Sequence, residues 1–194
     1  MRQQNWFPLY KIKKKKYSFT IRWGEATDTD DSEGKIIKKS NSRPNEEEIQ
    51  NALISFIGKI NQTPPNFSAI KIDGERSYKL ARKNISVRHK PRQIEVYEFT
   101  LKKILNIDSA EFEVICGKGT YVRSLARDLA EKLNTKGHVI KLRRHFVGNF
   151  NEKDKILIDF SEEIIHSPSF LKKIIPIEKV LDDIPALFLT ETEA

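Results

Sequence analysis

The sequence has a single cysteine and no long apolar run, and each absence excludes a class of protein. Cys116 is the sole cysteine among 194 residues, so no internal disulfide can form and a reducing, cytoplasmic compartment is expected. The longest run without Asp, Glu, Lys or Arg has eleven residues, Ile60 to Ile70, whereas a membrane-spanning helix needs about 20. Residues Met1 to Leu9 lack the apolar centre of a signal peptide. We therefore expect a protein with no membrane partner.

The sequence also lacks ligand residues at the spacing of a metal site. It lacks one glycine of the nucleotide-binding loop as well. The four histidines lie far apart, with no cysteine or histidine at ligand spacing (His89, His138, His145 and His166). The stretch from Gly117 to Thr120 is similar to part of the loop G-x-x-x-x-G-K-[ST], but the first glycine is absent and the order is G-K-G-T. We expect neither a metal ion nor nucleotide hydrolysis, although backbone N–H groups at this helix start can bind an RNA phosphate.

One cluster of acidic residues could provide paired carboxylates. Asp28, Asp30 and Asp31 stand close together in the polar turn from Thr27 to Gly34. Two carboxylates can act together on a glycosidic bond. In a turn of this composition, however, we expect all three to be solvated loop acids.

The basic residues are concentrated in two stretches. Lys and Arg number 35 against 27 Asp and Glu, a net charge of +8. Residues 151–194 hold ten acids and five lysines, so residues 1–150 carry +13. Lys71 to Arg92 and Lys118 to Arg144 each contain eight basic residues and two acids. This pattern is typical of a surface that binds a polyanion and also of an ordinary solvated basic surface, and charge alone leaves both open.

Hydrophobic periodicity predicts an α+β domain with a mixed, mainly antiparallel sheet and flanking helices. A capping box at Asn45 and Glu48 is followed by apolar residues at helical spacing until Gly58. The strands at 94–101 and 110–116 either form a hairpin or lie as non-adjacent neighbours. The predicted strands are 17–23, 69–72, 94–101, 110–116 and 138–150, and the predicted helices are 46–57, 77–83, 121–133 and 160–173.

Four segments resemble motifs of one enzyme family. NQTPPNFSAIKIDGERSYKLAR, from Asn61 to Arg82, is similar to the signature Q-x-P-P-x-[YF]-S-A-[LIV]-K-[LIV]-x-G-x-R-x-Y-x-x-A-R of the TruB family, the bacterial tRNA pseudouridine synthases. CGKGTYVRSLARDL, from Cys116 to Leu129, resembles the family motif C-S-K-G-T-Y-[IV]-R-[ST]-L-x-x-D-L. Tyr17 to Asp30 resembles Y-x-x-x-x-x-x-G-x-x-T-D-T, and His138 to Arg144 resembles H-[VL]-x-x-L-R-R. These segments follow the family's order, and the resemblance extends over roughly 16–194.

The resemblance implies the pseudouridine synthase catalytic fold and a tRNA pseudouridine synthase that isomerises the T-loop uridine (psi55) of tRNA, without metal or organic cofactor. The N–C glycosidic bond breaks, the base turns within its pocket, and a C–C bond forms. A stacked uridine cannot react in place, so it must first be flipped out, at a cost of roughly a few kcal/mol. The implied partner is the tRNA T-arm, bound by a monomer in the cytoplasm.

The family pattern also implies roles for individual residues. Tyr17 would stack on the flipped base, Tyr121 would contact the target nucleotide, and Leu142 would line the pocket. Arg123 would pair with the catalytic aspartate and hold it ionised. Spacing alone predicts an ordinary half-exposed helix turn in which Tyr121 and Arg123 point in different directions, and the resemblance overrides that interpretation.

Four basic residues are candidates for phosphate contacts. Such contacts position RNA and dominate the salt dependence of its binding. The alternative for each residue is a solvated surface side chain. The candidates are Lys71, Arg76, Lys118 and Arg143.

The chain departs from the family pattern at both ends. The catalytic aspartate belongs to a G-H-x-G-x-L-D-P-x-A block that precedes the strand at Tyr17. No such block occurs here, and Met1 to Ile12 contains neither Asp nor Glu. We expect an incomplete fold without a nucleophilic aspartate, inactive alone, unless a separate chain supplies the missing segment. The expected divisions are an atypical N-terminus read out of frame (1–16), a partial catalytic domain (17–137), and its C-terminal part with a truncated lead-in to an RNA-binding domain (138–194).

Other functions also stay open on this evidence. The chain can be a non-catalytic RNA-binding remnant, or a tRNA-folding aid that uses the same basic surface. A basic ribosome-associated protein is a third interpretation, and it would need none of Tyr17, Tyr121 and Arg123.

Overall fold

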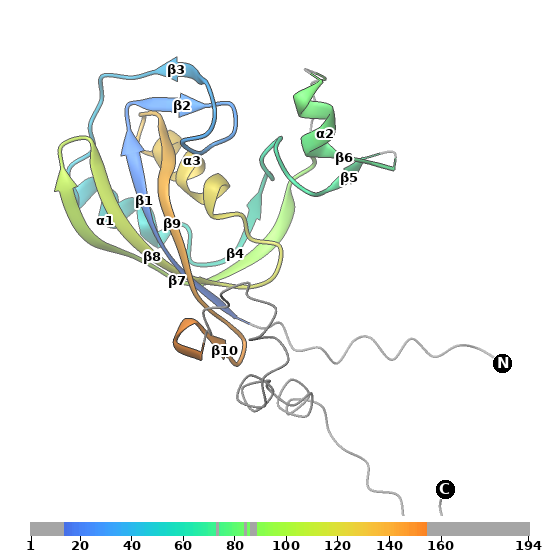
Figure 1. The fold of residues 1–194 in the computed structure, drawn as a ribbon. Helices are drawn as coiled ribbons and strands as arrows, with labels where there is room; N and C mark the ends of the chain where they lie inside the picture. Colours follow the sequence, from blue (N-terminus) through green and yellow to red (C-terminus); the bar gives the residue numbers. More distant parts are fainter. Residues whose placement is uncertain (1–13, 73, 84, 86–88, 155–194) are drawn as a thin grey trace, which may run out of the picture.

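The computed structural model describes residues 14–72, 74–83, 85 and 89–154, and its centre is one antiparallel sheet (Figure 1). The order in this six-stranded sheet is β10-β9-β1-β8-β7-β4, so β1 lies between β8 and β9. The predicted class, α+β with a mainly antiparallel sheet and flanking helices, is confirmed. The strands are β1 (Lys15–Trp23), β4 (Gly58–Gln62), β7 (Arg92–Asn106), β8 (Ser109–Cys116), β9 (Gly137–Val147) and β10 (Phe150–Asn151).

Period-two alternation in the two central strands builds the core. β1 buries Phe19, Ile21 and Trp23 on one face, and β8 buries every second residue from Ala110 to Cys116. The ring centroids of Phe19 and Phe112 lie 5.7 Å apart. Full burial of a large apolar side chain stabilises the fold by roughly 1.5–3 kcal/mol. A polar substitution at Phe19 or Phe112 would therefore break the packing of the sheet against the helices.

Two helices cover this same face of the sheet. α1 (Glu46–Ile54) begins with the predicted capping box, in which Asn45 and Glu48 each accept a hydrogen bond from the other's amide. It ends at Ile54, before the predicted stop at Gly58, where β4 begins. α3 (Val122–Lys132) packs its apolar face against β1 and β9. Within the described ranges, no helix is long and apolar enough to cross a membrane.

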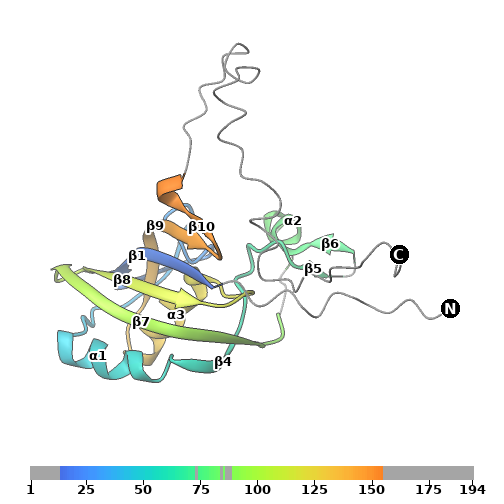
Figure 2. The same cartoon turned by 90° about the horizontal axis from the view of Figure 1, so that it is seen from below.

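Two small units project from the body on the same side in Figure 1. One is a ribbon of β2 (Glu25–Thr27) and β3 (Ile36–Lys39), and the other consists of β5 (Lys71–Ile72), β6 (Glu75–Arg76) and α2 (Ser77–Arg82). Figure 2 shows β4 and β10 at opposite edges of the curved sheet, with the short helix η2 (Glu152–Asp154) following β10.

Several elements differ from their predicted form, and the strand predicted at 138–150 is divided into β9 and β10. β7 and β8 pair directly, so of the two predicted arrangements the hairpin is the one observed. β7 is also longer than predicted, and its three register shifts with β8 let it bend. β4 was not predicted because Gly-Lys-Ile-Asn-Gln is poor in strand-forming residues, and its pairing with β7 creates it. The strand predicted at 69–72 is confined to β5. The helix predicted at 160–173 lies outside the described residues.

Candidate active site

The guanidinium of Arg123 ties three segments together at the start of α3. Its Nη1 donates to the carbonyl of Thr29 (2.8 Å) and to Oδ2 of Asp31 (2.9 Å), and its Nη2 donates to the carbonyl of Phe67 (2.8 Å). Three of the five guanidinium N–H donors thus have partners within the described residues. The other two have no partner among the described residues, and the side chain is 24% exposed.

Asp31 is not the solvated loop acid that the sequence predicts. Besides the bond from Arg123, its carboxylate accepts hydrogen bonds from the Thr29 hydroxyl (2.6 Å) and the Glu33 amide (3.1 Å). Asp28 likewise accepts a hydrogen bond, from the backbone amide of Lys35 seven residues further along the chain. The expectation was wrong for Asp31 because its arginine partner lies 92 positions away, and a pair so distant leaves no local pattern in the sequence.

A second ion pair lies one turn further along α3. Arg127 donates through Nη1 to Oδ2 of Asp30 and through Nη2 to the carbonyl of Thr63, both at 2.8 Å. Asp30 is 9% exposed, so burial raises the pKa of its carboxyl, while the Arg127 guanidinium lowers it. Asp30 is therefore also not a solvated acid. Residues four apart share a helix face, so Arg123 and Arg127 meet consecutive aspartates of one turn.

Tyr121 is the N-cap residue of α3, and a glutamine from another element holds its backbone. The Tyr121 amide donates to Oε1 of Gln62 (2.9 Å), and Nε2 of Gln62 donates to the Tyr121 carbonyl (3.1 Å). Gln62 ends β4 and is 1% exposed. Gln62 is the first residue of the signature Q-x-P-P, but nothing in the local pattern links it to a residue 59 positions away.

Tyr17 and Leu142 lie on the face of the sheet that carries the helices. Leu142 is opposite the buried Phe19 in the register between β1 and β9, and Arg144 is opposite Tyr17. Directly paired residues of antiparallel strands project to the same face. Tyr17 packs at the border of the core, and burial raises the pKa of its hydroxyl. Leu142 is 49% exposed, so it offers an apolar surface to a ligand.

Four of the predicted residues lie on β1, β9 and the start of α3, and α3 packs against both strands. Lys15 pairs with Cys116, so the chain leaves β8 and enters α3 beside the start of β1. This sheet end, with the first turn of α3 and the middle of β9, forms the candidate active site. Its four predicted members are Tyr17, Tyr121, Arg123 and Leu142.

The four candidates for phosphate contacts do not lie together. Lys71 and Arg76 are exposed and pair across β5 and β6, and Lys118 is exposed in the loop before α3. Arg143 is opposite Ser18, whose neighbours Tyr17 and Phe19 face the helices, so Arg143 projects from the opposite face.

Arg143 is therefore not brought to the candidate active site. Its Nε donates to Glu152 at 2.6 Å. Arg144, which shares the face of Leu142, was missed. The signal was present, because the period of two in a strand places Leu142 and Arg144 on one face.

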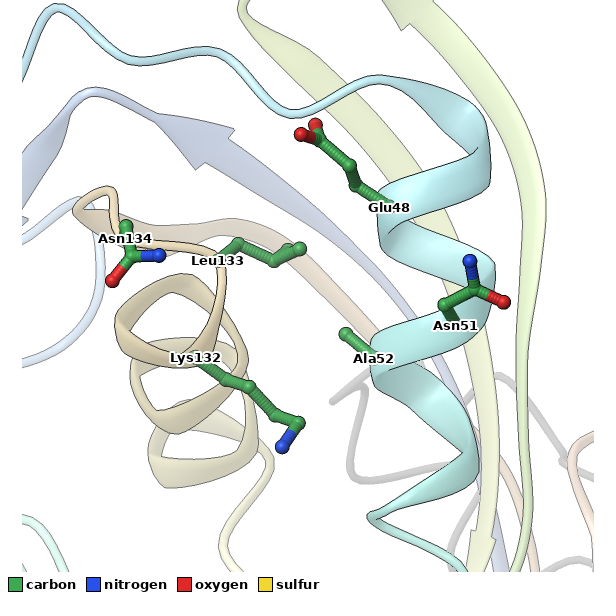
Figure 3. A pocket seen from close by; sticks show the side chains of 6 residues that line it. All are labelled: Glu48, Asn51, Ala52, Lys132, Leu133 and Asn134. Carbon is green, nitrogen blue, oxygen red and sulfur yellow. The ribbon is translucent and has the colours of Figure 1, made fainter.

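A hollow of about 410 Å³ lies between α1 and the end of α3 (Figure 3). It is at the opposite end of α3 from Arg123 and so takes no part in the candidate active site. Its lining residues are Glu48, Asn51, Ala52, Lys132, Leu133 and Asn134. In the part of the chain that the structure describes, no three His, Cys, Asp or Glu side chains gather as a metal site would require.

The fold resembles that of solved structures. A chain of a Cbf5-Nop10-Gar1 complex aligns with 89% of this chain at a TM-score of 0.63 and 23% identity, and the alignment covers 44% of that chain. A chain from an H/ACA RNP bound to a substrate RNA containing 2'-deoxyuridine aligns at 0.58 and 22% identity, covering 89% of this chain and 43% of that one. At these identities the likeness concerns the fold.

Sequence relatives are closer. A tRNA pseudouridine synthase B from Caulobacter sp. (strain K31) is 44% identical over 180 residues, 93% of this chain and 58% of the relative. Another, from Bradyrhizobium diazoefficiens, is 46% identical over 186 residues, 93% of this chain and 54% of the relative. The chain thus spans somewhat more than half the length of these curated relatives.

Two family models match nearly the whole chain. The model described as TruB family pseudouridylate synthase (N terminal domain) matches residues 5–122, and it begins upstream of the resemblance seen in the sequence. The model of the tRNA pseudouridylate synthase B C-terminal domain matches residues 123–182. The domain boundary expected at 137/138 stays a prediction. On these matches, the chain belongs to the TruB family of pseudouridylate synthases.

Proposed function

We propose that this chain is part of a tRNA pseudouridine synthase that acts on the T-loop uridine (psi55). The observation that carries the proposal is the Arg123 guanidinium at the start of α3, held by Asp31 and two carbonyls. It is a cation of fixed position, two of its N–H donors have no partner among the described residues, and α3 packs against the two strands that carry Tyr17 and Leu142. Family membership supplies the reaction.

Binding must bring the uridine out of its stack, and the site offers surfaces that offset this cost. Tyr17 would stack on the flipped base, Tyr121 would contact the nucleotide, and Leu142 would cover the base from β9. Stacking on an aromatic ring is worth about 1–3 kcal/mol per base, comparable with the cost of unstacking.

Phosphate contacts would then hold the RNA around the flipped base. Lys71, Arg76 and Lys118 are exposed, as is Arg144 on the face of Tyr17. These residues would position the RNA and make its binding depend on salt.

The proposed role of Arg123 rests on two N–H donors that have no partner among the described residues. A carboxylate bound there would be kept ionised by the adjacent cation and aimed into the pocket. Asp31 is unsuited to attack the sugar or base, because the Thr29 hydroxyl, the Glu33 amide and Arg123 already bind its carboxylate. We therefore assign Asp31 to orienting Arg123, and the reacting aspartate to a separate chain that supplies the missing family block.

The occupied state of Asp31 also favours a second candidate function. If no other carboxylate reaches Arg123, the 194 residues bind and flip the uridine without converting it. The chain would then be a non-catalytic RNA-binding remnant or a tRNA-folding aid.

A single experiment separates these functions. The full chain is incubated with a T-arm transcript, and pseudouridine is measured alongside the dissociation constant at two salt concentrations. Salt-sensitive binding without conversion supports the RNA-binding function, whereas stoichiometric conversion shows a complete synthase. Absence of binding at low salt would contradict both.

A further inference from the structure

Gln62 contacts the backbone of Tyr121 in a way that fixes the direction of its side chain. The Gln62 amide group accepts from the N–H of Tyr121 (2.9 Å) and donates to its carbonyl (3.1 Å). Holding both groups of one residue restrains its φ and ψ, here −104° and 114°, and so the Cα–Cβ direction. Of side chains this size, only an amide offers both a donor and an acceptor in one plane.

The local sequence of α3 does not provide this restraint. Tyr121 occupies the N-cap position, but no side-chain cap hydrogen bond is made there. Its carbonyl also accepts the first helical bond, from the Leu125 amide (3.1 Å). Within the described residues, Gln62 is the partner of the Tyr121 N–H, and its side chain is 1% exposed. A buried amide that loses these partners would remain unpaired, so the pairing is strongly specified.

Simple attachment of β4 to α3 does not require Gln62. The carbonyl of Thr63 already accepts the Ser124 hydroxyl (2.9 Å) and Nη2 of Arg127 (2.8 Å). Both bonds join the residue that follows β4 to α3, and neither involves the backbone of Tyr121. Gln62 therefore contributes something these two bonds do not, namely the orientation of residue 121.

We propose that Gln62 is a positioning residue, which holds Tyr121 in the orientation that receives the flipped nucleotide. This inference rests on the proposed function, because it needs an RNA ligand at Tyr121. Gln62 acts only through Tyr121 and has no contact with the RNA of its own.

The test is a double-mutant cycle on the full chain. Q62M is nearly isosteric and removes both hydrogen bonds. S124A is the matched control, since it removes one buried bond of the same junction without touching Tyr121. Dissociation constants for a T-arm hairpin and urea unfolding curves are measured for the wild type, Q62M, S124A, Y121A and Q62M/Y121A.

Q62M is expected to weaken RNA binding about tenfold, within the range that one aromatic stack provides, and S124A less than twofold. In the Y121A background, Q62M should change affinity less than twofold while still lowering the urea midpoint. The inference is overturned if Q62M weakens binding equally in both backgrounds, or no more than S124A does. If the wild type itself does not bind, the proposed function has failed, which is a different result.

A measurement on the wild type covers the case in which Q62M does not fold. The Tyr121 amide should exchange with solvent more slowly than the amides of Lys118 and Gly119 in the preceding loop. Equal exchange rates would show that Gln62 does not hold Tyr121.

Discussion

Two arginine–aspartate pairs lie on one face of α3, and they differ in burial and in how many carboxylates each arginine binds. Arg127 binds two carboxylates, Asp30 and Asp128, as well as the Thr63 carbonyl, and the side chain of Asp30 is 12% exposed. Among the described residues Arg123 binds one carboxylate, Asp31, as well as two carbonyls, and the side chain of Asp31 is 24% exposed. The same chemistry thus pairs a buried carboxylate at one position and a more exposed one a helical turn away.

The largest effect should come from removing the buried pair. R127A leaves the Asp30 carboxylate buried without its cation, and breaking a buried pair in this way costs about 3 kcal/mol. Urea unfolding at neutral pH measures the loss. A decrease below about 1 kcal/mol, the range of exposed pairs, would show that the two pairs are energetically alike.

Removing Arg123 should cost less stability. R123A loses a half-exposed pair and two bonds to carbonyls, so we expect a decrease of about 1 kcal/mol in the free energy of unfolding. Because Arg123 is assigned to holding a carboxylate, affinity for a T-arm hairpin should fall less than in Y121A. A larger affinity loss in R123A than in Y121A would place Arg123 on the RNA instead.

The pH dependence of stability distinguishes a buried acid from an exposed one. Burial raises the pKa of Asp30 above 3.8, so the folded chain holds this proton to higher pH than the unfolded chain. The contribution of Asp30 to stability therefore falls as pH rises from about 3.8 through the raised value. His145 and Arg143 lower the pKa of Glu152 from 4.5 to about 2, so its contribution is present above 4.5 and lost as pH falls toward 2.

Unfolding free energies of D30N and E152Q, compared with the wild type across the acid range, test this opposition. The wild-type advantage over D30N should shrink as pH rises, and the advantage over E152Q should grow. If both wild-type advantages changed with pH in the same direction, the buried environment of Asp30 and the exposed environment of Glu152 would not have the opposite effects described here. D30N is a suitable variant because residue 30 has a φ of 61°, which asparagine also adopts readily.

The smallest effect concerns two adjacent arginines of β9. R144A should lower the salt slope of T-arm binding by about 0.7–0.9, as the loss of one phosphate contact does. R143A removes a charge from the opposite face of the sheet and should leave the slope unchanged. Equal effects of the two variants would mean that the RNA contacts both faces.

Elements with local signals were predictable from the sequence. The capping box of α1 and the alternation in β1 and β8 lie within short windows, and all three elements formed as expected. The motif residues Tyr121 and Arg123 were found because the family pattern is contiguous around them.

Features that depend on distant partners were not predictable. β4 exists because β7 pairs with it, and the aspartates of the 27–34 turn are buried or paired because α3 approaches that turn. The signature that begins at Gln62 does not indicate that this residue binds Tyr121, which only the fold shows. In each case the partner is tens of residues away, where neither period nor propensity carries information.

The central claim is that the T-loop uridine enters the helix-bearing face of the sheet at the start of α3. Photo-cross-linking tests it directly, with a T-arm transcript that carries 4-thiouridine at the target position and mass spectrometry to map the adducts on the full chain. The account predicts adducts at Tyr17, Tyr121 or Leu142. Adducts confined to Ser18, Arg143 and His145, on the opposite face, would contradict it.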